Sequence, residues 1–273
     1  MAPYPLMSRP QVWGIVNVTP DSFSDGGRYA SLEAALEHAR RLIAEGADVL
    51  DIGGESTRPG AEPVSLEGEL ARVIPLIEAL RRETSTPISI DTLKPEAARA
   101  AIAAGASIWN DVTALRGAGD SLATAATLGC EVVLMHMQGE PRTMQAAPHY
   151  DDVTAEVINF LMERADAALA AGVARERIWL DPGIGFGKSL AHNLTLLQRL
   201  PEIVALGFPV LLGASRKRFI AGLDPSAASA EDRLGGSLGA ALRGAEAGCA
   251  AVRVHDALET RQALEVWAAI RDA

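Results

Sequence analysis

The chain has 273 residues, of which 48% are hydrophobic and 22% charged, a composition typical of a globular protein with a sizeable core. Its formal net charge of −10 disfavours nucleic acid and anionic membranes as partners, and no basic run offsets that charge. No apolar run has transmembrane length, and three prolines in the first ten residues replace the apolar core of a secretory signal, so we expect cytoplasmic residence.

Short apolar runs alternate with longer amphipathic ones along the chain, which is the pattern of repeated strand–helix units in a parallel sheet. The apolar runs predict eight strands, at residues 12–16, 47–50, 87–90, 106–109, 131–135, 177–180, 209–212 and 250–252. The amphipathic runs predict helices at residues 32–45, 66–82, 95–104, 121–128, 152–171, 190–200, 231–247 and 257–271. Ser31 and Gly46 fit the N-cap and the C-cap of the first helix.

A weak internal repeat supports this count, because in five places a glycine closes a helix and a strand begins at once. These glycines are Gly46, Gly105, Gly129, Gly207 and Gly248. In three of the repeats the strand ends on a polar residue five positions later: Asp51, Asn110 and Arg253. Cys130 and Cys249 each follow one of the glycines in an apolar stretch, and we expect reduced core thiols there.

Eight strand–helix units without a linker or a break in composition favour an α/β fold of the closed (β/α)8 TIM-barrel type. Periodicity alone leaves a doubly wound open sheet as the alternative. We expect one domain over residues 1–273, with its core at about 12–271.

Polar residues follow each of the predicted strands, where the active sites of barrel enzymes lie. They are Asn17, Asp51, Asp91, Asn110, His136, Asp181, Ser215 to Lys217, Arg253 and His255. Buried polar groups are costly without partners, so this ring implies a polar ligand. Carboxylates and amides suit the amino and lactam edge of a heterocycle, whereas Lys217, Arg253 and His255 suit anionic oxygens. The site should hold a flat polar ring beside a phosphate-like group.

Several of these residues also have a structural interpretation. Asp51 and Asp91 are placed to cap the helices or order the loops that follow them. His136 has no metal-ligand spacing to another His, Cys or carboxylate, which favours a satisfied core histidine. The stretch GIGFGKS at residues 183–189 is not a P-loop, because the first glycine of that motif would fall on Pro182.

The ordered motifs of the chain resemble those of the dihydropteroate synthases, a pterin-binding enzyme family. They are GIVNVTPDSFSDGG (14–27), DIGGESTRPGA (51–61), SIDTLKP (89–95), NDVTA (110–114), LMHMQGEPRTMQ (134–145), LDPGIGFGK (180–188), GASRKRFI (213–220) and RVHD (253–256). The resemblance runs from about residue 12 to the last helix. It implies condensation of 6-hydroxymethyl-7,8-dihydropterin diphosphate with p-aminobenzoate to 7,8-dihydropteroate and diphosphate, in folate biosynthesis.

The resemblance also implies a role for individual residues. The pterin-binding residues would be Asp91, Asn110, Asp181, Lys217 and Arg253, and the diphosphate-binding residues Asn17, Thr57, Arg253 and His255. The p-aminobenzoate pocket would be formed by Phe23, Pro59, Phe186, Lys217 and Arg218, and the catalytic residues would be Asp25, Arg58, Asp91 and Lys217. Arg218 departs from those members of the family that carry a serine after the lysine, so it either pairs with the p-aminobenzoate carboxylate or turns outward.

The family implies Mg2+ as the cofactor, with Asn17 as its ligand, and a homodimer as the assembly. Metal and cationic side chains would stabilise the departing diphosphate and carboxylates the cation-like carbon, so no enzyme nucleophile is needed. Two rival functions remain. One is a relative that transfers a methyl group from methyltetrahydrofolate to a corrinoid protein, and the other is a pterin-binding paralogue without activity.

Overall fold

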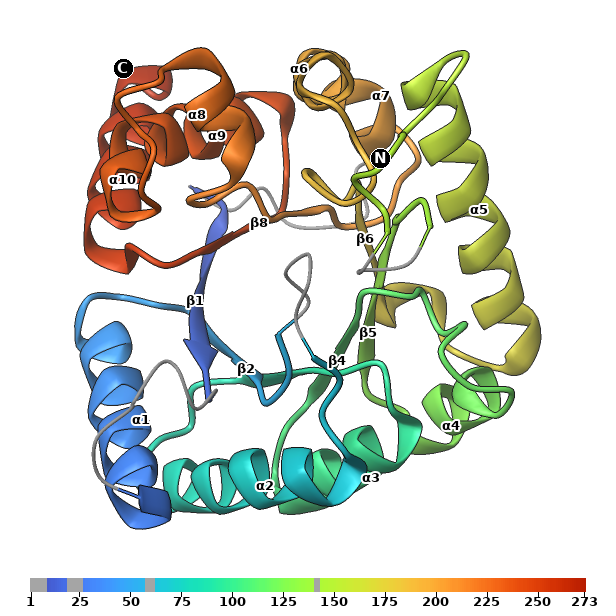
Figure 1. The fold of residues 1–273 in the computed structure, drawn as a ribbon, viewed down its shortest axis with the longest axis vertical. Coiled ribbons are helices and arrows are strands. Elements are labelled where there is room, and N and C mark those ends of the chain that lie inside the picture. Colours follow the sequence, from blue (N-terminus) through green and yellow to red (C-terminus); the bar gives the residue numbers. More distant parts are fainter. Residues whose placement is uncertain (1–8, 19–26, 57–61, 140–142) are drawn as a thin grey trace.

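The computed structural model describes residues 9–18, 27–56, 62–139 and 143–273, and the strands among them form one parallel sheet of eight (Figure 1). They are β1 (Gln11–Asn17), β2 (Val49–Gly53), β3 (Ile88–Asp91), β4 (Ile108–Asp111), β5 (Glu131–Met135), β6 (Ile178–Asp181), β7 (Leu211–Leu212) and β8 (Ala251–Val254). Their order in space is β6-β5-β4-β3-β2-β1-β8-β7, and a parallel bridge between Leu180 and Val210 joins the two ends. The sheet therefore closes into the predicted barrel, which excludes the open sheet.

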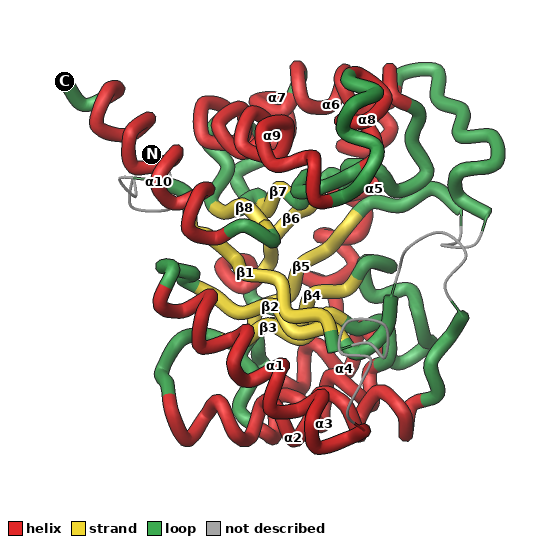
Figure 2. Tube along the Cα trace, turned by 60° about the vertical axis from the view of Figure 1, so that its left-hand side comes forward, coloured by secondary structure: helices red, strands yellow, loops and turns green. Residues whose placement is uncertain are grey.

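The helices surround this barrel (Figures 1 and 2). They are α1 (Gly27–Ala44), α2 (Leu66–Glu83), α3 (Pro95–Ala104), α4 (Ser121–Leu128), α5 (Val153–Ala171), α6 (Leu190–Gln198), α7 (Leu200–Val204), α8 (Arg218–Leu223), α9 (Leu234–Ala247) and α10 (Ala257–Arg271). Short 3-10 turns, η2 (Arg175–Arg177) and η3 (Glu231–Arg233), precede β6 and α9. The predicted helices at 95–104, 121–128 and 257–271 are confirmed to the residue.

Four details of the sequence prediction are wrong. Helix α1 begins at Gly27, so Ser31 lies inside the helix and is not its N-cap. The segment predicted as one helix at 190–200 is divided into α6 and α7, because Pro201 at the start of α7 has no amide to continue the hydrogen-bond ladder of α6. Helix α8 was not expected, and the segment 231–247 opens with a 3-10 turn.

The barrel interior is filled in layers because alternate residues of each strand point inward. The layer nearer the amino ends of the strands is apolar and consists of Trp13, Val49, Ile108, Val133, Trp179, Leu211 and Ala251. The ring centroids of Trp13 and Trp179 are 5.3 Å apart. The residue two positions further along a strand also points inward, and in β2, β4, β6 and β8 it is polar. This alternation carries Asp51, Asn110, Asp181 and Arg253 to one end of the barrel.

The five repeat glycines have positive φ angles, from 58° at Gly129 to 117° at Gly105, as expected for helix-closing turns. At Gly105 a Cβ atom would also lie 2.3 Å from the side chain of Arg81, so a larger residue does not fit. Cys130 and Cys249 are buried free thiols, which confirms that prediction.

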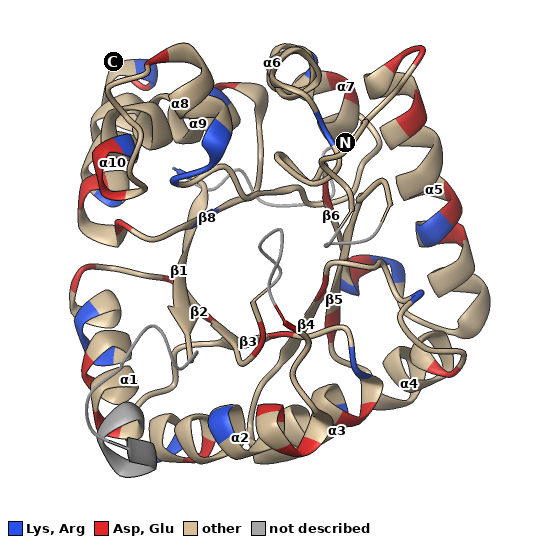
Figure 3. Cartoon of the chain, viewed as in Figure 1, with Lys and Arg blue, Asp and Glu red and all other residues tan. Residues whose placement is uncertain are grey.

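Charged residues of both signs lie along α1, α2 and α5 on the outside of the barrel (Figure 3). Within the described ranges, no helix has the length and apolar character needed to cross a membrane. The charges on α1, α2 and α5 make their outer face a solvated surface of mixed charge.

Candidate active site

A salt-bridge cluster lies at the carboxyl ends of β2, β3, β4 and β8. The guanidinium of Arg253 donates to Asp51 (Nε to Oδ2, 2.5 Å) and to Asp91 (Nη2 to Oδ2, 2.7 Å). The Asn110 amide donates to both carboxylate oxygens of Asp51 at 3.4 Å. Asp51, Asn110 and Arg253 are the three residues that follow a repeat glycine by five positions. Barrel closure thus brings together residues that are up to 202 positions apart in the chain.

Two carboxylates share one cation in this cluster. Burial raises the pKa of Asp91 to about 7, with Arg253 opposing the rise and Asp51 adding to it. Burial alone would lower the pKa of Arg253, but the charges of Asp51 and Asp91 outweigh burial and raise it, so the guanidinium stays protonated. Asp51 and Asp91 therefore bind a side chain from another strand, and they do more than cap or order the loops that follow them. Ionised, the cluster has a net negative charge and accepts hydrogen bonds.

Two further charged residues, Asp181 at the end of β6 and Lys217 after β7, influence each other electrostatically. The Lys217 ammonium donates to the carbonyl of Ile184 and lies 4.6 Å from the centre of the Phe186 ring. Gly213 has no side chain to cover the charged groups: a Cβ atom there would lie 3.6 Å from Asp181 Oδ2 and 3.8 Å from Lys217 Nζ. Burial raises the pKa of Asp181, and burial lowers the pKa of Lys217 to about 8 while Asp181 opposes that shift.

The loops after β7 and β8 meet through Ser215 and His255. The Ser215 hydroxyl lies 3.0 Å from His255 Nδ1 and accepts from the His255 amide at 3.2 Å. The next residue, Arg216, has a φ angle of 55°, a strained value for a residue other than glycine. Its guanidinium forms a two-point salt bridge with Asp256, at 3.0 and 2.5 Å. These contacts fix the turn that carries Lys217.

Asn17 ends β1 and is half-buried beside Gly53, which in turn pairs with Asp91. A Cβ atom on Gly53 would lie 3.7 Å from Asn17 Oδ1 and 3.6 Å from Asp91 Cβ, so the glycine leaves room between them. Within the described ranges, no group of three or more His, Cys, Asp and Glu side chains could hold a metal ion. An amide oxygen suits Mg2+, which commonly completes its coordination with water and substrate phosphate. The residues therefore fit Mg2+ that arrives with a phosphate ligand.

Phe186 borders an apolar cluster formed by Val112, Met135, Met137 and Met144. Methionine side chains adapt to neighbouring aromatic surfaces, so this cluster can support a flat ring. Arg218, the first residue of α8, is exposed.

Five predicted site residues lie outside the described residues: Phe23, Asp25, Thr57, Arg58 and Pro59. The other nine lie at the carboxyl ends of strands or in the segments that follow them: Asn17, Asp91, Asn110, Asp181, Phe186, Lys217, Arg218, Arg253 and His255. Direct contacts link Asp91 to Arg253 and Lys217 to Phe186, and Asn110 joins the first pair through Asp51.

His136 is a buried core histidine, which agrees with the structural interpretation of the sequence. Its ring packs edge-on against Phe160 of α5, with centroids 4.9 Å apart. Its Nδ1 lies 2.9 Å from the ammonium of Lys188. Burial and the charge of Lys188 lower the pKa of His136 to about 3, so the ring is neutral at pH 7.

Three polar groups near the strand ends were not predicted. Lys188 is buried in the loop after β6, and its only sequence signal was a lysine within a glycine-rich stretch. Asp111 is buried and accepts from the amide of Thr113 (2.7 Å), and its signal was its position directly after Asn110. Lys94 pairs with Glu55 and with buried Glu69, the latter at 2.7 Å. Charged residues are usually exposed, so the sequence gives no sign of this last group.

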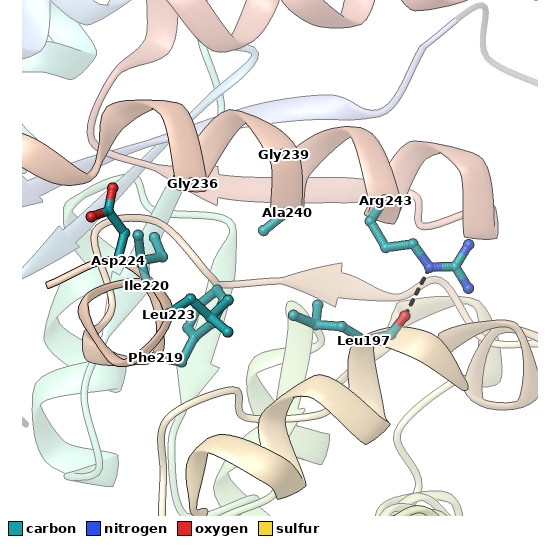
Figure 4. A pocket seen from close by; sticks show the side chains of 9 residues that line it. All are labelled: Leu197, Phe219, Ile220, Leu223, Asp224, Gly236, Gly239, Ala240 and Arg243. Atoms are coloured by element: carbon teal, nitrogen blue, oxygen red, sulfur yellow. Dashed lines mark hydrogen bonds between the residues drawn. The ribbon is translucent and has the colours of Figure 1, made fainter. Parts of the chain in front are cut away.

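An apolar pocket lies away from the strand ends, between α6, α8 and α9 (Figure 4). It is lined by Leu197, Phe219, Ile220, Leu223, Asp224, Gly236, Gly239, Ala240 and Arg243. Leu223 is 59% exposed. This composition differs from that of the charged site in the barrel.

Known proteins resemble this chain over almost its whole length. The model of a family described as "pterin binding enzyme" matches residues 13–255. The dihydropteroate synthase of Escherichia coli K12 is 50% identical over 260 residues, which cover 95% of this chain and 91% of that protein. The dihydropteroate synthase of Xanthomonas albilineans, solved with 4-aminobenzoic acid, has a TM-score of 0.91 and 54% identity, covering 97% of this chain and 94% of the other. Its complex with 7,8-dihydropteroate gives a TM-score of 0.89 and 51% identity, covering 98% and 96%.

Proposed function

The chain belongs to the pterin-binding enzyme family and has the activity of a dihydropteroate synthase, and we propose that its salt-bridge cluster binds the pterin substrate. The enzyme is a transferase of folate biosynthesis that joins 6-hydroxymethyl-7,8-dihydropterin diphosphate to p-aminobenzoate. The main support for this assignment is the salt bridge of Arg253 with Asp51 and Asp91, next to Asn110.

The pterin ring would be bound by Asp91, Asn110, Asp181, Lys217 and Arg253. A pterin presents N–H donors on its pyrimidine edge and a carbonyl acceptor next to them. The carboxylates of Asp91 and Asp181 suit the donors, while the Lys217 ammonium suits the carbonyl. The guanidinium of Arg253 is planar and already fixed by two carboxylates, so it can stack on the ring without a large loss of entropy.

The diphosphate would bind at the end of the site formed by Asn17, Thr57, Arg253 and His255. Ser215 Oγ lies 3.0 Å from Nδ1 of His255 and restrains the imidazole that would contact the diphosphate. The side-chain oxygen of Asn17 would bind Mg2+ together with the diphosphate oxygens. When bound, Mg2+ supplies positive charge that neutralises the diphosphate.

The p-aminobenzoate pocket would consist of Phe23, Pro59, Phe186, Lys217 and Arg218. The Phe186 ring supplies an apolar wall, since it packs on the methionine cluster behind it. The exposed position of Arg218 favours a contact with the carboxylate at the solvent side of the pocket.

In the reaction, the bond between the pterin methylene carbon and the diphosphate oxygen breaks, and the electron pair leaves with the diphosphate. The lone pair of the arylamine nitrogen then bonds to that carbon, and the nitrogen releases a proton. Lys217, Arg253 and His255 stabilise the departing anion, whereas Asp91 stabilises the positive carbon. Asp25 and Arg58 would complete the catalytic set. Catalysis is mainly electrostatic and positional.

We also propose that the chain is one domain, that it resides in the cytoplasm, and that it forms a homodimer. The single closed sheet and the charged outer surface support the first two proposals. The exposed Leu223 beside the apolar pocket supports the third.

The test is diphosphate release by the purified chain, given the pterin diphosphate and Mg2+, with and without p-aminobenzoate. Release with formation of 7,8-dihydropteroate only when p-aminobenzoate is present is the expected result. Pterin binding without turnover would instead favour the inactive paralogue or the methyl-transferring relative.

A further inference from the structure

Lys188 lies in the loop between β6 and α6, and it is only 3% exposed. Its ammonium donates to the carbonyl of Gly183 (2.9 Å), the carbonyl of Phe186 (3.0 Å) and Nδ1 of His136 (2.9 Å). A fourth, longer contact reaches the carbonyl of His136 at 3.4 Å. The three shorter contacts use all three N–H donors of the ammonium.

No carboxylate among the described residues forms a salt bridge with this ammonium. A buried cation normally has an ionised partner, because desolvation of an unpaired charge is costly. Burial indeed lowers the pKa of Lys188 to about 7, although Asp181 opposes the shift. His136 must be neutral with Nδ1 unprotonated to accept from Lys188, which agrees with its low pKa. The pair is therefore arranged to hold backbone carbonyls.

The loop that Lys188 holds has little conformational preference of its own. Gly183, Gly185 and Gly187 all have positive φ angles, between 61° and 84°. Other side chains also bind the loop: Gln145 donates to the Gly185 carbonyl, and Asp181 accepts from the Gly183 amide at 2.7 Å. Asn193 of α6 accepts from the Gly185 amide at 2.7 Å, and the Tyr150 hydroxyl donates to the Gly187 carbonyl at 2.8 Å. Because glycines cost the most conformational entropy to order, such a loop needs side-chain ties to keep one shape.

This loop contacts the charged site directly. The Ile184 carbonyl accepts from Lys217 Nζ, and the Phe186 ring lies 4.6 Å from the same atom. Lys188 binds the carbonyls on both sides of Ile184, at Gly183 and Phe186. Loss of those two hydrogen bonds would therefore free the Ile184 carbonyl, which accepts from Lys217, and the Phe186 ring to move.

We infer that Lys188 is a positioning residue, with His136 as its neutral partner, that fixes Phe186 and Lys217 for the second substrate. This inference rests on the proposed assignment of Phe186 and Lys217 to the p-aminobenzoate pocket. Of the five proposed pterin contacts, Asp91, Asn110 and Arg253 are linked through Asp51 on other strands and do not touch this loop. Asp181 and Lys217 do contact it, so the pterin should depend on Lys188 less than p-aminobenzoate does.

The first measurement is hydrogen exchange of the backbone amides in the full chain without ligands. Lys188→Met keeps an unbranched side chain as far as Cε and removes the ammonium donors. We expect exchange of peptides covering residues 183–188 to accelerate at least about tenfold, while peptides from β1 to β4 stay unchanged. Leu76→Ala in α2, a buried residue far from this loop, is the control for general loss of stability. Unchanged exchange at 183–188, or an equal acceleration in Leu76→Ala, would overturn the inference.

The second measurement is a double-mutant cycle with Phe186→Ala. Lys188→Met should raise KM for p-aminobenzoate about tenfold and KM for the pterin diphosphate by a smaller factor, because three of its five proposed contacts do not touch this loop. In the Phe186→Ala background the same substitution should have less than half its effect on KM for p-aminobenzoate, because the ring it positions is gone. Independent, multiplicative effects of the two substitutions would overturn the inference.

The two measurements separate this inference from the proposed function. If the wild-type chain released no diphosphate, the function would fail, yet hydrogen exchange would still decide whether Lys188 holds the loop. If Lys188→Met does not fold, Lys188→Gln keeps one amide donor group and is measured in the same two ways. It should change both readouts in the same direction, by about threefold.

Discussion

The ammonium of Lys217 sets the upper pH limit of the reaction that we propose. Its pKa is lowered to about 8, so the group is charged at pH 7 and loses its proton as the pH rises through 8. We expect kcat/KM for p-aminobenzoate to fall above pH 8, and Lys217→Ala to abolish turnover. In the control Lys217→Arg, whose guanidinium stays protonated, any remaining activity should lack this alkaline limb. A wild-type profile that is flat to pH 10, or near-normal activity of Lys217→Ala, would contradict the assignment.

Asp181 provides a separate test of the pterin contacts. Its carboxylate is buried and accepts from the Gly183 amide at 2.7 Å, which leaves the other oxygen for a ligand. Asp181→Asn keeps the shape but replaces one acceptor with a donor, which would face an N–H group of the pterin. We expect pterin affinity to fall about 10- to 100-fold in calorimetry, and diphosphate affinity to change much less. Equal losses for both ligands would argue against a contact with the pterin edge.

His136 couples protonation to stability. Its pKa is lowered to about 3 in the folded chain, so between pH 6.5 and 3 the unfolded chain binds a proton that the folded chain does not. Stability should therefore fall on acidification across this range, by up to about 1.4 kcal/mol per pH unit from this residue. His136→Asn keeps an acceptor for Lys188 and should lower that slope in denaturant titrations at pH 7, 6 and 5. The same change at exposed His149 should leave the slope as in the wild type.

At the scale of elements, the loop after β6 depends on close backbone approach at Gly183. A Cβ atom there would lie 1.9 Å from the carbonyl oxygen of His136, and its φ angle is 66°. Gly183→Ala should destabilise the chain by at least about 2 kcal/mol and weaken p-aminobenzoate binding, because the loop must move. Gly235→Ala in α9 is the matched control, since no atom lies within 4 Å of its Cβ position. It should be neutral or stabilising by up to about 1 kcal/mol in thermal unfolding.

Elements with a strong period and clear ends could be predicted from the sequence. Helices α3, α4 and α10 and strand β5 agree with their predicted ranges to the residue. The start of α1 could not be predicted, because Ser31 is a good N-cap residue by composition, yet the helix begins four residues earlier. The break between α6 and α7 was missed because the apolar period continues across it. Sequence patterns within an element predict its type, whereas where the element begins and ends also depends on the neighbouring loops.

At the scale of the whole molecule, the sequence predicts which polar residues lie at the ends of the described strands, but not how their side chains pair. A polar residue at the end of a barrel strand must lie at one end of the barrel, so Asp51, Asn110 and Arg253 were found from spacing alone. That Arg253 bridges Asp51 and Asp91 depends on register and on side-chain length, which the sequence does not give. The buried ammonium of Lys188 was missed for a related reason. Its carbonyl acceptors belong to the backbone, which has no sequence signature.

The proposed homodimer can be tested at α8. Leu223 of α8 is 59% exposed at the edge of the pocket between α6, α8 and α9, and exposed apolar side chains at such edges are common in subunit interfaces. Leu223→Asp would bury an unpaired charge in such an interface, at a cost of several kcal/mol. Light scattering should give twice the chain mass for the wild type and the mass of one chain for Leu223→Asp.

The matched control for this prediction is Ala103→Asp. It introduces the same charge at an exposed position of α3, on the other side of the barrel from α8 (Figure 1). This variant should keep the wild-type mass, because a solvated carboxylate on an outer helix has no desolvation cost. A dimer that survives Leu223→Asp would mean that another surface forms the interface, and a monomeric wild type would remove the assembly from the proposed function while leaving the barrel site intact.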